Sequence, residues 1–379
     1  MDETAALEAA RSFAREVVAP NAAAWELRRR MPDEAFREAG ARGLCGLIVP
    51  REQGGAGCGA AAMARVVQAL AAADMAFAFG LVVHNNLAGA VARSGSEAQR
   101  RRHLPEMLAG RRIGAFLLTE PRGGSDAAAI ETRAVRDGAG WRLDGEKAWA
   151  SNAAHAGLLS VYAQTDPAQG WRGIASFLVD PATPGIEPTG PYEMLGGHAL
   201  GTGGFRFVGA RVPADAVFAP AGAAFKAAMA GIDLARVNVA AACCGLLEAA
   251  LDCALDRIAA RPAFGGMLAD QQGLQWLLAD VATELEASRL LAYDAAAKLD
   301  AGADAAVGAA HAKKFATRAA LKGVADCMQA MGAEGLRHGH PLARHLAGAK
   351  IAQYLDGATE IQNVVISRAL LKGRPRRAP

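Results

Sequence analysis

The chain has 379 residues, of which 52% are hydrophobic and 21% are charged, and its formal net charge is only +3. This length is sufficient for two or three domains with a sizeable buried core. The small net charge and the lack of a basic stripe in the sequence argue against a nucleic-acid partner.

Neither the chain ends nor the one long uncharged segment predicts secretion or a membrane span. Residues 1–11 are acidic and are not followed by an apolar core, so a secretory signal is not expected. Residues 75–92 contain no charged residue, but His84 and Asn85 lie in the middle and argue against a lipid-facing helix. The basic segment 372–377 is expected to be a solvated end.

The cysteines and histidines suggest no special chemistry. The six cysteines show neither CxxC spacing nor a disulfide-dense pattern, which fits a protein of the reducing cytoplasm. His338, His340 and His345 are close in sequence, but no Cys or carboxylate with ligand spacing lies beside them. No metal site is therefore expected.

Residues 1–112 are predicted to form an N-terminal α domain. They are rich in Ala, Leu, Arg and Glu, and their apolar residues have helical spacing, as at Phe13 and Val17 before Pro20. Within this region, residues 55–60 (GAGCGA) match one form of a dinucleotide-binding fingerprint. Four residues, PREQ, separate this motif from the preceding apolar run, so we interpret it as a loop between helices.

Residues 113–220 are predicted to form a middle β domain, and they contain half of the chain's 16 prolines. The Asp-Gly dipeptides at 137–138 and 144–145 flank the short segment AGWRL, and such dipeptides are hairpin signals. Residues 176–180 (SFLVD) and 203–212 (GGFRFVGARV) have the pattern of strands.

Residues 221–379 contain few prolines and many Ala and Leu residues in helical periods, for example at 274–299. Because Ala has the best helix propensity, this region is predicted to be a bundle of long helices. Residues 352–371 (AQYLDGATEIQNVVISRALL) also have helical spacing, but Asp356 and Gly357 interrupt it. Such a pair is costly inside a helix, so it indicates a functional reason.

Two polar segments of the middle region carry groups that suit a bound ligand. In residues 117–126 (LLTEPRGGSD), Thr119 and Ser125 offer hydroxyl groups, and two glycines allow close approach of the backbone. In residues 145–153 (GEKAWASNA), Trp149 offers a flat stacking face. Taken alone, these segments could equally be a polar turn and a buried structural tryptophan.

In their order and spacing, these segments resemble the acyl-CoA dehydrogenase family of flavoproteins along nearly the whole chain. The motifs that carry the resemblance are GLCGLIVPREQGGAG, HNNL, QRRRHLPEMLAGRRIGAFLLTEP, LTEPRGGSD, KAWASNA, ARVPADAVF, RPAFGGMLADQQGLQWLLAD and DGATEIQNVVISRALL. The resemblance implies an α+β multidomain fold with an N-terminal α domain (1–112), a middle β-barrel-like domain (113–220) and a C-terminal four-helix bundle (221–379). It also implies FAD as the cofactor, held between the domains.

The resemblance assigns cofactor-binding roles to residues of this sequence. Those expected to line the flavin and the thioester side of the site are Phe116, Leu118, Thr119, Gly124 and Ser125. Trp149 and Ser151 are expected against the isoalloxazine ring. Ala358 and Glu360 are expected to contact FAD close to the residue that acts as the base. Of these, Ser151 would lie near the N5 atom that accepts hydride.

A second set of residues would reach the FAD of a neighbouring subunit. They match the family's R-x-x-F-G…Q pattern and glycine-rich loop, and they are Arg261, Phe264, Gln272, Gln329, Gly332 and Ala333. A guanidinium fork suits a pyrophosphate, which agrees with Arg261. The enzyme would then be at least a dimer, and the family suggests a dimer of dimers. Because Ala333 replaces a usual glycine and Glu334 adds an anion, weaker FAD binding is expected.

In the family, the base that removes the α-proton is usually a glutamate followed by glycine, and the matching residue here is Asp356. Flavin N5 accepts hydride from Cβ, while the base residue's backbone N–H and the ribityl chain hydrogen-bond the thioester carbonyl. Gly357 fits a distorted backbone that presents these groups to the substrate. Asp233 and Arg236 resemble residues that bind the acyl-CoA pantetheine, and Ala235 occupies the position where some relatives carry the base.

Three interpretations of Asp356 follow from its length, because aspartate is shorter than glutamate by about 1.5 Å. An uncompensated displacement of that size can lower a rate roughly a hundredfold. The chain could be a working dehydrogenase whose backbone or substrate has shifted. It could be an oxidase of another C–H acid, as nitroalkane oxidases share the fold and use an aspartate, although their arginine seven residues later is Asn363 here. It could also be a catalytically weak flavoprotein with a binding or assembly role.

We therefore predict FAD-dependent α,β-dehydrogenation of an acyl thioester to the trans-2-enoyl thioester in the cytoplasm, with Asp356 as base. Electrons would pass to an electron-transfer flavoprotein. CoA and an acyl-carrier protein present the same phosphopantetheine, so either could carry the acyl group. Leu355 replaces a common tyrosine, and His84 and Asn85 are expected near the acyl end, which together suggest a short, branched or polar acyl group.

Overall fold

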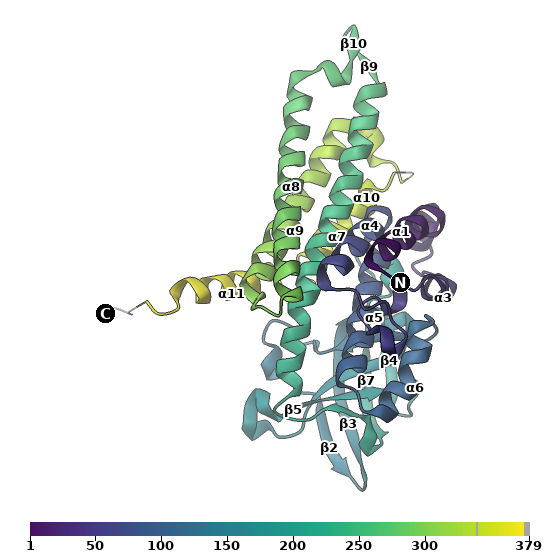
Figure 1. The fold of residues 1–379 in the computed structure, drawn as a ribbon, viewed down its shortest axis with the longest axis vertical. Coiled ribbons are helices and arrows are strands. Elements are labelled where there is room, and N and C mark those ends of the chain that lie inside the picture. Colours follow the sequence, from purple (N-terminus) through teal and green to yellow (C-terminus); the bar gives the residue numbers. More distant parts are fainter. Residues whose placement is uncertain (339, 375–379) are drawn as a thin grey trace.

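The structure, a computed structural model, describes residues 1–338 and 340–374. The prediction for residues 375–377 of the basic segment therefore lies outside the described residues. The molecule is elongated: the N-terminal helices and the sheet occupy one end, and the long C-terminal helices extend to the other (Figure 1).

The N-terminal region is helical, as predicted. Its helices are α1 (Glu3–Phe13), α2 (Ala19–Leu27), α3 (Asp33–Ala41), α4 (Ala60–Ala73), α5 (Met75–Ser94) and α6 (Glu97–Leu108). A π-helical turn at Ala14–Val18 joins α1 to α2, so the predicted helix continues with a changed hydrogen-bond pattern. Pro20 explains the turn, because it offers no N–H to the carbonyl of Glu16 and its ring crowds that carbonyl.

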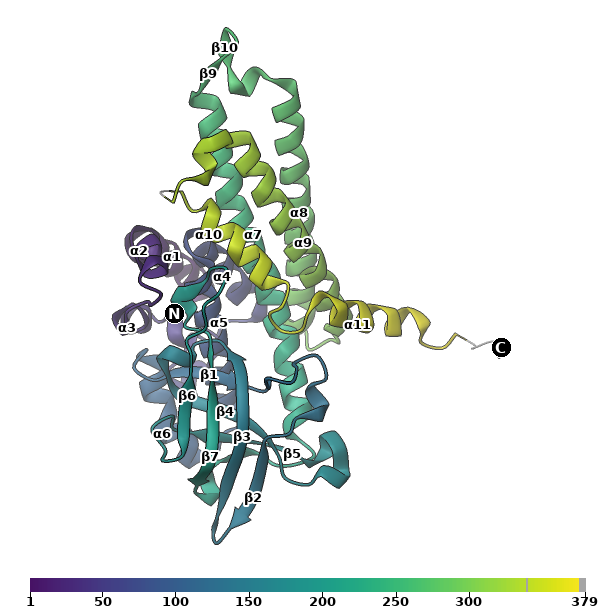
Figure 2. The ribbon, with the colours of Figure 1, turned by 180° about the vertical axis from the view of Figure 1, so that it is seen from behind.

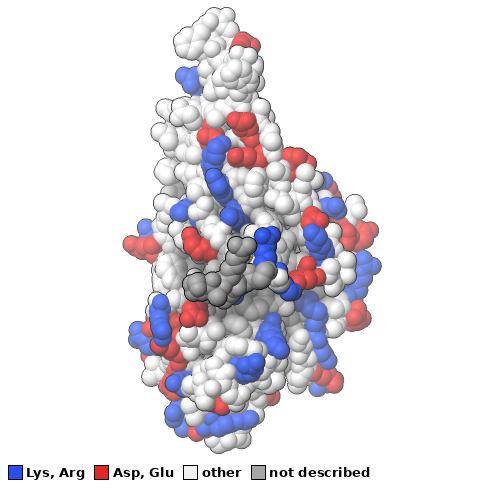
Figure 3. Space-filling view, turned by 90° about the vertical axis from the view of Figure 1, so that its left-hand side faces the viewer, with Lys and Arg blue, Asp and Glu red and all other residues white. Residues whose placement is uncertain are grey.

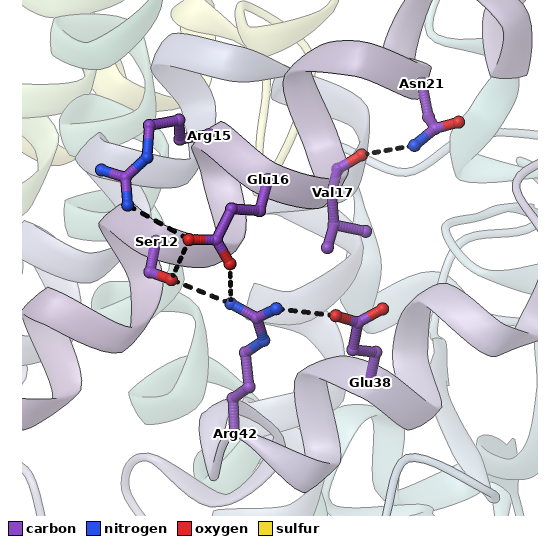
Figure 4. A network of polar contacts seen from close by, with 7 residues as sticks. All are labelled: Ser12, Arg15, Glu16, Val17, Asn21, Glu38 and Arg42. Carbon is purple, nitrogen blue, oxygen red and sulfur yellow. Dashed lines mark hydrogen bonds and ion pairs between the residues drawn. The ribbon is translucent and has the colours of Figure 1, made fainter.

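The π-helical turn is also where α3 is attached to α1 (Figure 4). Arg42, directly after α3, donates to Ser12 Oγ at 3.0 Å and to Glu16 Oε2 at 3.1 Å. Asn21 donates its side-chain amide to the carbonyl of Val17 at 2.8 Å and so satisfies a carbonyl of the turn. Since most of these groups are exposed, they orient the helices more than they stabilise the fold.

The middle region is an eight-stranded sheet. Its strands are β1 (Ile113–Leu117), β2 (Arg133–Asp137), β3 (Gly140–Ala150), β4 (Ala156–Gln164), β5 (Ile174–Val179), β6 (Ile186–Thr189), β7 (Gly203–Val212) and β8 (Val217–Ala219). Their order is β6-β7-β3-β2-β4-β5-β8, and β1 pairs with β4 in parallel. The strands predicted from SFLVD and GGFRFVGARV are confirmed within β5 and as β7.

Only one of the two Asp-Gly dipeptides forms the predicted hairpin turn. Asp137 ends β2, and Gly138, at φ +58°, starts the turn into β3. The prediction for the second dipeptide is wrong, because Asp144 and Gly145 lie inside β3, where the register against β7 shifts. Gly145 has φ +138°, and a Cβ there would be 2.7 Å from Thr132 Cα. Gly145 therefore serves a bulge and a close approach of two strands rather than a turn.

The C-terminal region is the predicted bundle of long helices. Its elements are α7 (Ala224–Ala260), β9 (Pro262–Ala263), β10 (Gly266–Met267), α8 (Gln272–Asp300), α9 (Ala306–Met331), α10 (Leu342–Ala352) and α11 (Thr359–Leu371). The β9–β10 hairpin joins α7 to α8 at the tip of the bundle (Figure 1). Helix α11 projects sideways and carries the described end of the chain away from the body (Figures 1 and 2).

Short 3-10 helices lie in the connections. They are Leu44–Gly46, Arg51–Gln53, Ala127–Ala129, Ala153–His155, Pro167–Gly173, His198–Leu200, Ala214–Ala216, Leu268–Asp270 and Gly332–Leu336. Helices α5 and α7 are long and apolar enough to cross a membrane, but 83% of the most apolar window of each is buried inside the protein. Most of their apolar residues belong to the main core, which joins the N-terminal helices to the bundle, while the end of α5 and the first turns of α7 belong to two smaller clusters.

Residues 55–60 form a loop that leads into α4 at Ala60, as predicted. The backbone amides of Ala60 and Ala61 donate to the carboxylate of Asp300, at the end of α8, at 2.5 and 3.0 Å. In a dinucleotide-binding fold, a pyrophosphate would lie at such a helix N-terminus. Here a carboxylate of the protein takes that place and ties the N-terminal region to the bundle.

Candidate active site

The two ligand-binding segments predicted in the middle region lie side by side. Lys147, in β3, donates to the carbonyl of Leu118 at 3.0 Å and to Glu120 Oε1 at 2.8 Å. The amide of Ala148 donates to the carbonyl of Thr119 at 3.0 Å. Side chain and backbone together hold the segment after β1 against the end of β3.

Glu120 and Lys147 form a buried ion pair that the sequence motifs did not reveal, with side chains 7% and 0% exposed. Glu120 also accepts from the amides of Glu131 and Thr132 at 2.7 and 2.9 Å. Burial alone would raise the pKa of Glu120, but Lys147 and these hydrogen bonds outweigh it and hold that pKa below its ordinary value. Burial lowers the pKa of Lys147 to about 8, although Glu120 opposes the shift. Burial thus disfavours the charged form of both groups, and each charge stabilises the other.

Trp149 and Ser151 follow at the end of β3, where the backbone is strained. Trp149 has φ +58°, which is rare for a bulky residue. Its side chain is 59% exposed and packs edge-on against Tyr192, with ring centroids 4.9 Å apart. Ser151 is buried. A buried structural tryptophan is thus excluded, and an aromatic face held exposed under strain fits a surface that another planar group covers.

Thr119 is half-buried just before a turn that follows β1, and Gly124 and Ser125 are exposed just after this turn. Residues 121–126 are exposed, and Glu120 and Gly123 form an antiparallel bridge that closes the turn. A Cβ on Gly124 would be 3.1 Å from the side chain of Thr119, so a larger residue would press on that hydroxyl. This turn leaves Ser125 accessible to a ligand.

Phe116 and Leu118 pack against the start of α7, and this helix leads to the other predicted residues. Both belong to a hydrophobic cluster that includes the first turns of α7. Further along α7, Arg236 Nη1 donates to Asp233 Oδ1 at 2.9 Å, and Arg236 Nε donates to the carbonyl of Asp356 at 3.1 Å. One helix therefore contacts both the loop after β1 and the Asp356 loop.

Asp356 and Gly357 break the chain between α10 and α11, as predicted. Their φ angles are +49° and +93°, in a region that aspartate tolerates better than most residues and glycine adopts freely. Side chains from other helices hold the carbonyls of this loop. Lys313 Nζ donates to the carbonyls of Gln353 at 3.2 Å and Gly357 at 2.5 Å. Gln362 Nε2 donates to the same Gly357 carbonyl at 2.9 Å.

The Asp356 carboxylate has a buried oxygen without a partner. Its Oδ2 atom is buried and accepts no hydrogen bond within residues 1–338 and 340–374. Burial raises the pKa of Asp356 above its ordinary value, while the positive charges of Lys313 and Arg236 oppose that shift. Burial raises the pKa of Asp233 in the same direction, and Arg236 again opposes it. A carboxylate with a free oxygen and a pKa moved toward neutrality has the properties of a general base.

The residues predicted to reach a neighbouring subunit gather at the far end of the bundle. Arg261, Phe264 and Gln272 lie at the junction of α7 with α8, and Gln329 and Gly332 lie at the end of α9. Phe264 is 92% exposed with φ +56°. The tip carries few charged side chains on the face from which α11 projects (Figure 3).

Arg261 and Gly332 bring the two segments of this second group together. A Cβ on Gly332 would be 3.3 Å from Arg261 Nη1. The dihedral angles of Gly332, φ +66° and ψ −151°, fall in a region that essentially only glycine adopts. Because Gly332 has no side chain, the end of α9 can approach the Arg261 guanidinium closely. The backbone beside the guanidinium is therefore not covered by a side chain at position 332.

The two groups of predicted residues do not meet within one chain. Arg236 and Arg261 stand at positions 25 residues apart along α7, which at 1.5 Å per residue is about 37 Å. The first group lies around Asp356 and the sheet, and the second lies at the bundle tip (Figure 1). Each chain therefore presents two separate half-sites.

At Ala333 and Glu334 the chain departs from the glycine-rich loop of the family, but neither residue disturbs the local structure. Ala333 is exposed in the 3-10 helix that follows α9, and the positive φ in this segment falls on Gly332 instead. Glu334 accepts from His340 at 3.1 Å and from Arg337 at 3.2 Å. The hydrogen bond with His340 holds the pKa of Glu334 below its ordinary value. Its charge is thus already paired.

Ala358 and Glu360 lie at the start of α11. The carbonyl of Ala358 accepts from the amide of Ile361 at 2.9 Å, and Glu360 is exposed in the first turn. The loop around Gly357 separates Glu360 from Asp356, so the two carboxylates do not lie on one continuous helix. A negative charge at this position also complements the helix dipole.

The expectation that His84 and Asn85 lie near the acyl end stays a prediction. Both are fully buried. His84 Nδ1 accepts from the amide of Gly114 at 3.2 Å, so Nε2 carries the proton that faces the carbonyls of Cys45 and Met107. Asn85 makes three hydrogen bonds to backbone groups, and burial lowers the pKa of His84 to about 4. The polar atoms of both side chains therefore hydrogen-bond to buried backbone groups.

Two of the three histidines that are close in sequence, His340 and His345, lie in different surroundings. His345 is buried in α10, and His340 contacts Glu334. Across the described ranges, no three His, Cys, Asp or Glu side chains are grouped so that they could hold a metal ion. All six cysteines are free, and five of them are buried.

Family comparisons match all three regions of the chain. Residues 1–111 match "Acyl-CoA dehydrogenase, N-terminal domain", residues 115–209 match the middle domain, and residues 222–371 match the C-terminal domain. An acyl-CoA dehydrogenase of Bacillus subtilis is 35% identical to this chain over 364 residues, which is 96% of each protein.

Solved structures share the whole arrangement. Butyryl-CoA dehydrogenase from Megasphaera elsdenii is 32% identical, with a TM-score of 0.94, and the match covers 98% of both chains. A glutaryl-CoA dehydrogenase from Mycobacterium smegmatis in complex with FADH2 is 28% identical, with a TM-score of 0.92, over 99% of this chain and 96% of that one.

Proposed function

The chain belongs to the acyl-CoA dehydrogenase family, and we propose that it uses FAD and Asp356 to convert an acyl thioester into the trans-2-enoyl thioester. The predicted α+β multidomain fold is confirmed, and the protein is an oxidoreductase of this class. The observation that carries the proposed mechanism is the buried, unpartnered Oδ2 of Asp356 on a loop held by three helices.

FAD is the cofactor, as the family and the FADH2 complex of a structural neighbour indicate, and the residues of this chain fit it. Trp149 presents a strained, exposed aromatic face, and Arg261 presents a guanidinium beside the open backbone of Gly332. We propose that Trp149, Ser151 and Thr119 hold the flavin ring system, and that Arg261 of a neighbouring subunit holds the pyrophosphate. When bound, FAD supplies the acceptor for the hydride that leaves the substrate Cβ.

Asp356 takes the α-proton of the substrate in this proposal. Its free oxygen is the acceptor, and its raised pKa brings the basicity of the carboxylate closer to the working pH. The backbone at Asp356 and Gly357 hydrogen-bonds the thioester carbonyl as negative charge develops there. Asp233 and Arg236 bind the pantetheine arm and support the loop through the Asp356 carbonyl.

The substrate and electron acceptor follow from the same chemistry. Butyryl-CoA and glutaryl-CoA dehydrogenases are among the similar structures, which supports a short or polar acyl group on CoA. A branched acyl group and an acyl-carrier protein stay alternatives. Two electrons must leave the reduced flavin in each turnover, and we propose an electron-transfer flavoprotein as their acceptor. The cytoplasm as location and the domain bounds 1–112, 113–220 and 221–379 stay predictions.

A panel of short, branched and aromatic acyl-CoAs, mixed anaerobically with the yellow protein, tests the proposed reaction. At least one thioester is expected to bleach the flavin absorbance and to give its enoyl product. Bleaching by a nitroalkane or another activated C–H acid alone would favour the oxidase interpretation, which rests on aspartate in place of glutamate. If neither class nor a carrier-bound thioester reduces the flavin, a binding or assembly role becomes the better account.

The position of Arg261 predicts that the cofactor site is shared between subunits of a homo-oligomer. Replacing Arg261 with glutamine is expected to weaken FAD binding about 10- to 100-fold, because a charge-assisted fork to the pyrophosphate is lost. Fluorescence titration of apoprotein with FAD measures this change. The Arg318→Gln variant, on the exposed face of α9, is the matched control and should bind FAD normally.

Co-expression of two differently tagged variants distinguishes shared sites from sites within one chain. A mixed oligomer of Asp356→Asn and Arg261→Gln subunits contains one site built only from native half-sites for each mixed pair. Recovery of activity in this oligomer, at up to half the native value, supports sharing. Activity no higher than that of the two pure variants would show that Arg261 acts within its own chain.

A further inference from the structure

Lys313 is a buried cation in the C-terminal bundle that the proposed reaction does not yet use. Its side chain is 0% exposed, and it lies on α9 between buried residues Ala312 and Ala316. A buried ammonium group is costly unless hydrogen bonds or opposite charge compensate it. The location therefore indicates a specific task for this lysine.

The hydrogen bonds of Lys313 fall on both sides of Asp356. The ammonium group donates to the carbonyl of Gln353, three residues before Asp356, and to that of Gly357, directly after it. Between these two points the chain passes through the positive φ angles of Asp356 and Gly357. A non-glycine residue in that region is strained and persists only where its surroundings fix it. Lys313 is one of the groups that fix it.

Of the two cations that act on the Asp356 carboxylate, Lys313 and Arg236, only Arg236 is paired with another carboxylate in the described part of the chain. The titratable side chains around the loop come from α7, α9, α10 and α11, and they are Asp233, Arg236, Cys243, Lys313, Lys350 and Glu360. Arg236 is paired with Asp233 at 2.9 Å, and Lys350 donates to the side chain of Gln353. Lys313 donates to two neutral carbonyls that flank Asp356, and no ion pair within the described residues neutralises its charge.

The two charges influence each other in the expected directions. Burial lowers the pKa of Lys313, and the negative charge of Asp356 opposes that shift. Burial raises the pKa of Asp356, and Lys313 is the first of the two cations that oppose it. Removing the lysine charge would therefore leave the carboxylate more easily protonated.

We propose that Lys313 is a positioning residue for Asp356: it fixes the loop through two carbonyls and keeps the carboxylate ionised when a substrate covers it. This inference rests on the proposed role of Asp356 as base. The two parts can be separated, because glutamine at position 313 retains a donor for a carbonyl but has no charge, whereas methionine removes both.

The test compares Lys313→Gln, Lys313→Met and the matched control Lys314→Gln, which alters the next residue of the same helix. The first measurement needs no turnover: the Asp356 carboxyl is titrated by infrared difference spectroscopy against Asp356→Asn. We expect its pKa to rise by about one unit or more in Lys313→Gln, since a nearby charge typically changes the pKa of a carboxyl by that amount. Lys314→Gln should titrate like the native protein.

The second measurement is the pH profile of flavin reduction by the thioester found in the panel. In Lys313→Gln the whole profile should move to higher pH, because the carboxylate then ionises at higher pH. If the pKa of Asp356 rises by one, the rate on the acidic side should fall about tenfold and recover at alkaline pH. In Lys313→Met, faster hydrogen exchange of the 353–358 backbone should accompany this change. If the methionine variant does not fold, the glutamine variant alone decides.

The outcomes distinguish a failure of the Lys313 inference from a failure of the proposed function. An unmoved carboxyl titration in Lys313→Gln overturns the inference, and so does an equal loss of rate at every pH, which indicates a purely structural lysine. A native protein that no thioester reduces counts against the proposed function, while the carboxyl titration still decides whether Lys313 controls Asp356.

Discussion

Replacing Asp356 with asparagine is expected to slow flavin reduction by an acyl-CoA about 10²- to 10⁴-fold, the usual contribution of a positioned general base. Asparagine has nearly the same shape and also tolerates a positive φ, so the loop between α10 and α11 should persist. The substitution therefore removes the proton acceptor without removing the backbone that holds the thioester. Anaerobic stopped-flow absorbance measures the rate constant, with FAD content and melting temperature as checks on folding.

The pH dependence makes this prediction sharper. A base must be ionised to act, and burial raises the pKa of Asp356. The native rate should therefore rise with pH through an apparent pKa above that of an ordinary aspartate, and the residual rate of the asparagine variant should not follow it. Asp280→Asn, on the exposed side of α8, is the control. Native-like reduction of the Asp356→Asn flavin would remove Asp356 from the mechanism.

Replacing Glu120 with glutamine is expected to lower the free energy of unfolding by about 3–5 kcal/mol at neutral pH, the typical result of breaking a buried ion pair on one side. The variant leaves Lys147 fully buried without its anion and weakens the hydrogen bonds from Glu131 and Thr132. The same carboxylate anchors the segment with Thr119 and Ser125, so FAD affinity should fall as well. Urea unfolding and FAD titration measure the two effects.

The stability deficit of Glu120→Gln should depend on pH in one direction. The folded-state pKa of Lys147 is about 8, below the unfolded value of 10.5, so protonated Lys147 destabilises the folded state. This penalty is absent above the unfolded pKa and appears as pH falls toward and below the folded pKa. The variant lowers the folded pKa further, so its deficit should be largest in acid and small near pH 9. Glu131→Gln, at an exposed ion pair, is the matched control. A deficit equal at pH 6 and pH 9 would argue against the lysine as its source.

Sequence periodicity predicted the elements whose formation depends on local pattern. The apolar period at 274–299 lies within α8, and the alternation at 203–212 coincides with β7. The break at Asp356 was also readable, because an Asp-Gly pair inside an apolar helix pattern conflicts with helix propensity. These features depend on residues close in sequence, so a single chain is enough to show them.

Features that depend on distant residues were not readable in the same way. The sequence pattern predicts a turn at Gly145, whereas glycine is required there because the backbone of Thr132 on the neighbouring part of the sheet leaves no room for a Cβ. The roles of Lys147 and Lys313 depend on carbonyls that only the fold brings near. One signal was available for Lys313, because it shares helical spacing with buried alanines, and a charge in such a stripe needs a buried partner.

Helix α7 has a genetic consequence, since 25 positions along it separate Arg236, beside the Asp356 half-site, from Arg261 in the other half-site of the same subunit. Under the proposed arrangement, a subunit damaged at both ends of α7 would impair its own site and that of its neighbour. A cell that makes both native and damaged chains would then lose more activity than the damaged fraction alone accounts for. The damaged allele would then act partly dominantly over the native one, because one long helix places the two half-sites of a chain in different active sites.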